Sequence, residues 1–207
     1  MLKRFEIEAK TIEEAERKAI ELLRLPLEKI TLNIIKEKKG ILGIGSSTTY
    51  EALPNVNLAL EGKRYLESIF KELGIEVKME MRVKEDGENI KYDIFSDENA
   101  ILIGVEGRTL RSFQMLLRNY LNTFTTTSVI VNLDIGNYNQ NRKKQLEILA
   151  TKTAKEVART NIEAKLQPMS SFERRIIHTK LAEWRDVYTE SIGEGEERQI
   201  IIKPSKK

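Results

Sequence analysis

The sequence "IGVEGRTLRSF", residues 103–113, places two glycines around a two-residue loop interior. Gly104 and Gly107 carry no Cβ, so this loop can turn tightly and can let another backbone approach closely. The residues that follow recur with helical spacing and predict one buried stripe, formed by Leu110, Phe113, Leu117 and Leu121. We therefore expect a turn that leads into a helix N-terminus, where unpaired N–H groups and the helix dipole favour anions.

The segment around this loop, residues 58–135, has the predicted order α-β-β-α-loop-α-β. The expected elements are a helix over 58–74, strands over 75–87 and 88–96 joined by an Asp86-Gly87 hairpin turn, and a β-branched strand over 127–134. Helical spacing predicts that the first helix buries Leu58, Tyr65, Leu66, Ile69 and Leu73. By itself, a glycine-bracketed loop favours a simple joint between two helices over a phosphate site, because such loops occur often by chance.

Residues 1–52 alternate in a pattern typical of strand, helix, strand and strand. Thr11 and Glu14 form a capping-box signature at the start of the helix, and Lys39-Gly40 is a candidate hairpin turn. Residues 53–57, with a proline and two asparagines, are the candidate linker to the next segment.

The last segment, residues 136–207, begins with a long predicted helix over 140–165. Helical spacing assigns its inner face to Leu146, Leu149, Ala150, Thr153 and Val157. A second helix is expected to start at Ser170, because Glu173 completes a capping box, and a strand hairpin should turn around Gly193-Glu194-Gly195.

The only histidine of the chain, His178, follows Arg174 by one helical turn in "ERRIIH". Their side chains should share one face, beside the apolar Ile177 and Leu181. No nucleophile motif accompanies the histidine, so a catalytic role is not predicted. An isolated histidine at the edge of an apolar face is often structural, but a guanidinium and an imidazole one turn apart can also bind a phosphate or stack on a base.

Positive charge is concentrated in the last segment. The whole chain has a net charge of +3, whereas residues 136–207 hold 15 Lys and Arg against 10 Asp and Glu. On the long helix, one narrow arc gathers Lys144, Lys152, Lys155 and Arg159. This arc fits equally a solvated lysine-rich face and a ridge that neutralises a sugar–phosphate backbone.

Composition excludes several classes of protein. With no cysteine and one histidine, disulfides, thiolate catalysis and most zinc or haem sites are ruled out. Only a carboxylate-based Mg²⁺ or Ca²⁺ site stays open, and no cofactor is expected. No apolar run approaches the roughly 20 residues that span a bilayer. These features predict a cytoplasmic protein without a transmembrane segment.

Three motifs, in order, resemble those of a known family. "KKGILGIGS" is similar to the signature of the Jag N-terminal domain, the strand-helix-GxxG-helix-strand order resembles a type-II-like KH domain, and Arg174 and His178 match the Arg-x-x-x-His (R-3-H) domain. Together they resemble the bacterial Jag family of SpoIIIJ-associated RNA-binding proteins, also called KhpB. The expected fold is α+β in three small modules: 1–52, 58–135 and 136–207.

The resemblance implies a non-enzymatic, cytoplasmic protein that binds single-stranded RNA, with single-stranded DNA as a further ligand. The expected contact residues are Gly104, Val105, Glu106, Gly107, Arg108, Arg111, Lys144, Lys152, Lys155, Arg159, Arg174, Arg175 and His178. It further implies a small KH-domain partner protein, links to cell division, elongation, envelope or sporulation, and association with a membrane-protein insertase. The alternative is a protein-interaction adaptor of an insertase or divisome component, for which RNA is incidental.

Overall fold

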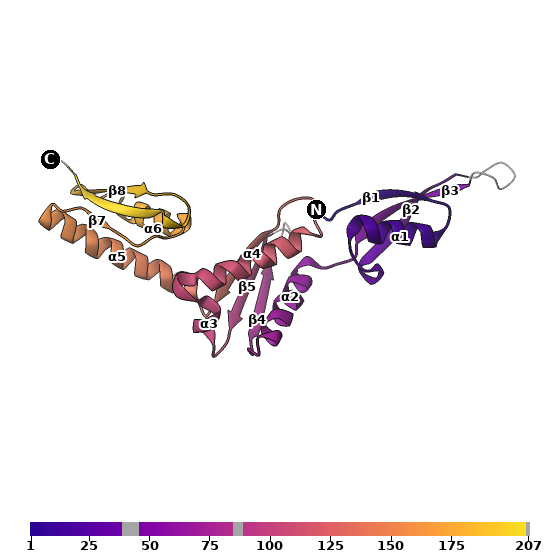
Figure 1. Cartoon of the computed structure of the whole chain (residues 1–207), viewed down its shortest axis with the longest axis horizontal. Coiled ribbons are helices and arrows are strands. Elements are labelled where there is room, and N and C mark those ends of the chain that lie inside the picture. Colours follow the sequence, from indigo (N-terminus) through magenta and orange to yellow (C-terminus); the bar gives the residue numbers. More distant parts are fainter. Residues whose placement is uncertain (39–45, 85–88, 206–207) are drawn as a thin grey trace. The chain divides into compact units, whose positions relative to one another are not determined.

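The computed structural model describes residues 1–38, 46–84 and 89–205, so the predicted turns at Lys39-Gly40 and Asp86-Gly87 lie outside the described residues. The chain divides into two compact units, Met1–Gly136 and Asn137–Lys207. Each unit combines helices with small three-stranded sheets, which confirms the predicted α+β class (Figure 1).

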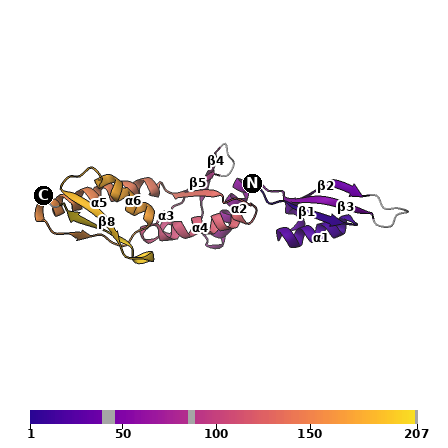
Figure 2. The ribbon, with the colours of Figure 1, turned by 90° about the horizontal axis from the view of Figure 1, so that it is seen from above.

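The first unit begins with a three-stranded antiparallel sheet in the order β1-β3-β2. Its strands are β1 (Phe5–Ala9), β2 (Ile30–Lys38) and β3 (Ser47–Pro54), and α1 (Ile12–Leu23) covers one face, as Figure 2 shows. The predicted N-cap is confirmed, because the Thr11 side chain accepts from the N–H of Glu14. The helix leads through the 3₁₀ turn η1 (Leu27–Lys29) into β2. Their shared core contains Ile7, Ala19, Leu23, Ile30 and Ala52.

The rest of the first unit follows the predicted order of elements. The elements are α2 (Leu58–Glu72), β4 (Lys78–Val83), β5 (Asn89–Phe95), α3 (Asn99–Ile103), η2 (Val105–Gly107), α4 (Arg108–Asn122) and β6 (Ile130–Ile135). Strand β5 is central, antiparallel to β4 and parallel to β6. All four residues of the predicted α4 stripe are buried. Because β3 continues through Pro54, the segment between β3 and α2 is residues 55–57 rather than the expected 53–57.

The predicted stripe of α2 was right in part. Leu66 is buried, Leu58, Tyr65 and Ile69 are half-buried, and Leu73 is exposed. The fully buried residues of this helix are Ala59, Glu61, Gly62, Leu66 and Phe70. Small residues on the inner face let the helix approach its neighbours. A Cβ at Gly62 would lie only 2.1 Å from the Tyr92 hydroxyl, which donates to the carbonyl of Ala59 at 3.0 Å.

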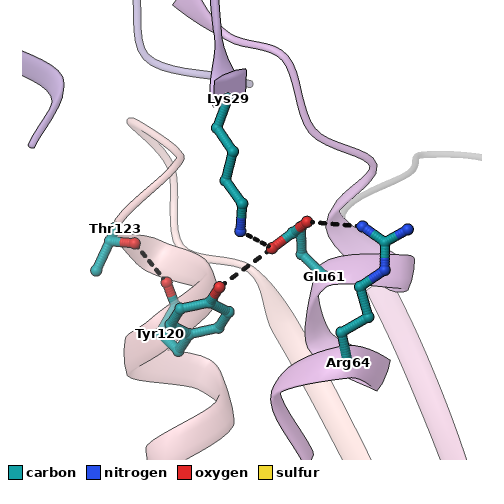
Figure 3. A network of polar contacts seen from close by, with 5 residues as sticks. All are labelled: Lys29, Glu61, Arg64, Tyr120 and Thr123. Atoms are coloured by element: carbon teal, nitrogen blue, oxygen red, sulfur yellow. Dashed lines mark hydrogen bonds and ion pairs between the residues drawn. The ribbon is translucent and has the colours of Figure 1, made fainter. Parts of the chain in front are cut away.

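A polar network joins η1, α2 and α4 within the first unit (Figure 3). Glu61 is nearly buried and its carboxylate accepts from Lys29 Nζ at 2.7 Å and from the Tyr120 hydroxyl at 3.1 Å. Arg64 Nη1 lies 3.4 Å from the other carboxylate oxygen. Burial alone would raise the pKa of Glu61, but these donors outweigh it and hold the pKa below its ordinary value.

The second unit packs two helices on one sheet. The elements are α5 (Tyr138–Thr160), β7 (Ala164–Lys165), α6 (Ser171–Leu181), β8 (Val187–Ile192), η3 (Gly195–Glu197) and β9 (Gln199–Pro204), and the sheet order is β7-β9-β8. The predicted hairpin is confirmed, with Gly193 and Gly195 both at positive φ. The core gathers Leu146, Ala150, Ala154 and Val157 from α5, Ile177 and Leu181 from α6, and Val187, Ile200 and Ile202 from the sheet.

Two expectations for the long helix were wrong. It ends at Thr160 rather than continuing to residue 165, because Asn161 adopts a left-handed conformation with φ 56° and its N–H caps the carbonyl of Val157. Ala164 and Lys165 instead pair with β9. On the inner face, Leu149 is 40% exposed and Ala154 is buried in its place, since a small side chain lets the helices approach closely.

Candidate functional site

The start of α6 is fixed by a capping box and a buried ion pair. The Ser170 side chain accepts from the N–H of Glu173, and Glu173 Oε2 accepts from the N–H of Ser170 at 3.0 Å. Arg142 Nε on α5 donates to Glu173 Oε1 at 2.8 Å. Burial alone would raise the pKa of Glu173, but the hydrogen bonds from Arg142 and Ser170 hold it below its ordinary value. These interactions fix the start of α6, the helix that carries Arg174 and His178.

Arg174 and His178 share one flank of α6, as their spacing predicted, and both contact strand β8. Arg174 Nη1 donates to Ser191 Oγ at 3.1 Å. His178 Nδ1 lies 2.5 Å from Thr189 Oγ1, and His178 Nε2 lies 3.1 Å from Ser191 Oγ. These four residues, Arg174, His178, Thr189 and Ser191, form a half-buried cluster that we call the Arg–His edge.

The histidine of this edge favours the neutral form. Burial, and secondarily the positive charge of Arg174, lower the pKa of His178 below its ordinary value. Ser191 Oγ already accepts from Arg174, and its own O–H can still donate to a neutral His178 Nε2. In that arrangement Nδ1 carries the ring proton and donates to Thr189 Oγ1. Arg174 then supplies the positive charge of the edge.

Arg174 also has hydrogen-bonding capacity that the described residues do not use. Its Nε atom is buried and has no acceptor within the described part of the chain. Because this Nε is shielded from solvent, Arg174 can meet a ligand only through the other N–H groups of its guanidinium. One of these, Nη1, is held against β8 by Ser191.

The basic residues predicted on α5 are exposed and line an open groove. Lys144, Lys152 and Lys155 lie on the exposed side of the helix, and so does Arg159. A groove of about 510 Å³ between α5 and α6 is lined by Lys144, Glu147, Ile148, Thr151, Lys152, Lys155 and Lys180. We call this surface the lysine groove; Arg159 continues the same arc of α5 but does not line it.

The Arg–His edge and the lysine groove lie on different flanks of α6. The buried stripe of this helix consists of Glu173, Ile177 and Leu181. At about 100° per residue, Arg174 and His178 lie to one side of that stripe and Lys180 lies to the other. Arg175 is exposed on the outer face. The basic residues of this segment therefore form two separate surfaces.

The glycine-bracketed loop of the first unit turns tightly through two glycines at positive φ. Gly104 has φ 69° and ψ −178°, a region that only glycine adopts readily, and Gly107 has φ 74°. Val105 is 75% exposed at the tip. Arg111 Nη1 donates to the carbonyl of Glu106 at 2.8 Å, so this arginine closes the loop.

Helix α4 begins directly after this loop, with no side-chain cap at Gly107. Its first-turn N–H groups therefore lack the acceptor that a serine or aspartate N-cap would supply. Arg108 is exposed at the same helix terminus. The loop thus has the features of an anion-binding turn, with the carboxylate of Glu106 as an unfavourable neighbour for a phosphate.

Sequence reasoning missed Thr189, Ser191, Ile148 and Lys180. The alternation of Thr189 and Ser191 on β8 indicated that they share a face, but not that α6 lies against that face. Lys180 follows Arg174 by six residues, which on a helix places it on another side. These contributions depend on long-range packing.

The described residues form neither a candidate metal site nor a candidate membrane span. Within residues 1–38, 46–84 and 89–205, no three His, Cys, Asp or Glu side chains come together as they would around a metal ion. In the same part of the chain, no helix combines the length and the apolar character that crossing a bilayer requires.

Two family models match this chain. The Jag N-terminus matches residues 7–49, and the R-3-H domain matches residues 144–204, which contain the Arg–His edge and the lysine groove. The two matches agree with the motifs at the beginning and the end of the sequence.

Similar proteins cover almost the whole chain. An RNA-binding protein KhpB of Clostridium symbiosum is 36% identical over 95% of this chain and 89% of its own length. That of Bacillus subtilis (strain 168) is 32% identical over 93% of this chain and 94% of its own length. The KhpB of Lactiplantibacillus plantarum is 34% identical over 67% of this chain and 42% of its own length. At this identity and coverage, together with both domain matches, the chain belongs to the Jag (KhpB) family.

Proposed function

We propose that this protein binds single-stranded RNA and performs no chemistry on it. The observation that carries the proposal is the Arg–His edge. There, an arginine held against β8 by Ser191 lies one helical turn from a histidine that contacts the same serine, and both side chains are half-buried. Guanidinium groups bind phosphates through several parallel N–H donors, which fits a nucleic-acid backbone. The printed names of the relatives, RNA-binding protein KhpB, support the same ligand.

Two further groups of residues belong to the proposal: the exposed basic residues of α5 in the second unit and, separately, the glycine loop of the first unit. Lys144, Lys152, Lys155 and Arg159 would neutralise phosphates. Residues 104–107, with Arg108 and Arg111, would hold backbone at the N-terminus of α4, in the manner of a type-II-like KH domain. The mixed sheet with parallel β5 and β6 and the α3-loop-α4 order support that assignment. Arg175 would contact RNA from the outer face of α6.

The test is a binding series with single- and double-stranded RNA and DNA at two salt concentrations. We expect single-stranded RNA to bind best, with a log–log salt slope of about −0.7 per phosphate contacted. Replacing Arg174 and His178 together by Ala should weaken binding by about ten- to a hundredfold, the range for losing charge-assisted contacts. Arg185→Ala, an exposed change in the same unit, is the control and should have little effect. Salt-independent binding, or equal affinity in the double variant, would refute the proposal.

In the cell, we place this activity in post-transcriptional regulation in the cytoplasm. The family relationship is the support for linking it to cell division, elongation, envelope or sporulation processes, for a small KH-domain partner protein and for an insertase contact. Two experiments test the regulatory role: sequencing of the transcripts that co-purify with the protein, and measurement of the levels of those transcripts after deletion of the gene. Unchanged transcript levels in the deletion strain, or bound transcripts unrelated to those processes, would count against it.

The second candidate is an adaptor whose partners are proteins. Strand β2 is an edge of its sheet, and Ile34 and Ile35 on it are exposed at a bulge. Exposed apolar side chains on a sheet edge favour a protein partner. Crosslinking in cells, followed by sequencing of bound RNA and mass spectrometry of bound proteins, separates the two candidates. Protein adducts at β2 without RNA adducts at the second unit would favour the adaptor.

A further inference from the structure

The lysine groove is strongly cationic and its positive charges are not neutralised by the protein. Its lining contains four lysines and one carboxylate, that of Glu147. Among the described residues, none of Lys144, Lys152, Lys155 and Lys180 forms an ion pair, whereas Glu147 lies 3.9 Å from Lys143 Nζ, outside the lining. An anionic occupant that runs along this surface would therefore be attracted by several ammonium groups in turn.

The groove is elongated along α5, unlike a pocket that holds one small anion. Its lining on α5 runs from Lys144 to Lys155, which corresponds to about 16 Å along the helix axis. Between the lysines, Ile148 is 68% exposed and Thr151 adds a hydroxyl. An alternation of ammonium groups with an apolar surface suits the charged backbone and the ribose or base faces of a polynucleotide.

We infer that the lysine groove is a second RNA-contact surface, which holds the sugar–phosphate backbone independently of the Arg–His edge. This inference rests on the proposed function and adds a consequence to it. Because the two surfaces lie on different flanks of α6, a short oligonucleotide occupies one of them, and a longer strand occupies both. Affinity therefore rises with RNA length beyond what one surface gives, since the second contact becomes intramolecular.

The test compares oligouridines of about 4 to about 16 nucleotides, the span of common single-strand binding sites. The variant replaces Lys144, Lys152, Lys155 and Lys180 by Gln. The control replaces four exposed lysines of the first unit, Lys10, Lys36, Lys71 and Lys78, by Gln and makes the same change in net charge. Fluorescence of Trp184, which packs against the core of the second unit, verifies that the groove variant is folded.

We expect the groove variant to bind the longest RNA at least about tenfold more weakly than the control variant does, with a salt slope shallower by about 3. Its affinity for the shortest RNA should remain within about threefold of the control, because the Arg–His edge is intact. Equal length dependence and equal salt slopes in the two variants would overturn the inference and the phosphate role of the α5 lysines, while RNA binding at the Arg–His edge would stand. A wild-type protein that binds no RNA of any length at low salt would overturn the proposed function itself. Competition by polyglutamate as effective as by RNA of equal charge would assign the groove to an acidic protein instead.

Discussion

Arg142 Nε on α5 lies 2.8 Å from Glu173 Oε1 on α6, and the same carboxylate caps α6 through Ser170. One side chain thus joins the two helices of the second unit and fixes the start of the helix that carries Arg174 and His178. Both partners are largely buried, so the interaction is screened little by solvent. The loss of this interaction takes a charged partner from a largely buried group, which costs more than the loss of a surface ion pair.

Replacing Glu173 by Ala should lower the free energy of unfolding of the second unit by about 3 kcal/mol, because Arg142 loses the buried carboxylate that it contacts and the N–H of Ser170 loses its acceptor in the capping box. Urea unfolding followed by the fluorescence of Trp184, the only tryptophan, reports on this unit. Lys143→Ala removes the more exposed pair with Glu147 and should cost less than about 0.5 kcal/mol. A Glu173→Ala cost as small as that of the control would contradict this role.

His178 should titrate below the ordinary histidine pKa of 6.5, because burial and the neighbouring Arg174 disfavour its charged form. As pH falls below 6.5, the unfolded chain takes up a proton that the folded protein does not, so stability should fall with acidification through the folded-state pKa. The single histidine makes the NMR titration unambiguous. His178→Gln should remove this component of the pH dependence. A midpoint above 6.5 would show that the Arg–His edge is arranged differently.

The affinity for RNA should depend on the protonation of His178. A phosphate beside His178 favours the imidazolium and raises its pKa, so affinity should increase as pH falls through the window below 6.5. Anisotropy titrations with a labelled oligonucleotide between pH 7.5 and 5.5, run on wild type and His178→Gln, measure the effect. The variant should show a flatter profile. Identical profiles would mean that no phosphate lies against this histidine.

Gly104→Ala should destabilise the first unit by about 2–4 kcal/mol, because the backbone lies in a glycine-only region and the new Cβ would lie 2.1 Å from Thr109 Oγ1. Gly74→Ala is the matched control, since Gly74 has φ 70° but open space around it. It should cost only about 1 kcal/mol for the left-handed conformation. Circular dichroism during urea unfolding measures both. Equal costs would show that the loop relaxes around the methyl group.

The fold was predictable where a pattern is local, and less so where packing is long-range. The α4 stripe was predicted in full because Leu110, Phe113, Leu117 and Leu121 recur with helical spacing on one face. On α2 the same reasoning was right only in part, since Gly62 and Ala59 face the sheet and a carboxylate, Glu61, takes a buried position against Lys29. Hydropathy alone does not show that Gly62 is buried because Tyr92 packs against it, or that Glu61 is buried because Lys29 pairs with it.

For the candidate site the same distinction holds. The shared face of Arg174 and His178 follows from one helical turn, and the structure confirms it. The hydroxyls of Thr189 and Ser191 come from a strand that reaches α6 only through the tertiary fold. Lys180 joins lysines that precede it by 25 or more positions in the chain because α5 packs against α6.

Lys29→Met should destabilise the first unit, because Glu61 is nearly buried and would keep only the Tyr120 hydroxyl and the solvent-exposed Arg64 as donors. Since Lys29 is itself about a third exposed, we expect a cost of about 2 kcal/mol rather than the full cost of an isolated buried charge. The double variant Lys29→Met with Glu61→Gln should recover part of that loss, because no buried charge remains. Hydrogen exchange of α2 and α4 peptides, analysed as a double-mutant cycle, measures the coupling directly. Strictly additive effects would show that the Lys29–Glu61 hydrogen bond contributes nothing to the stability of the unit.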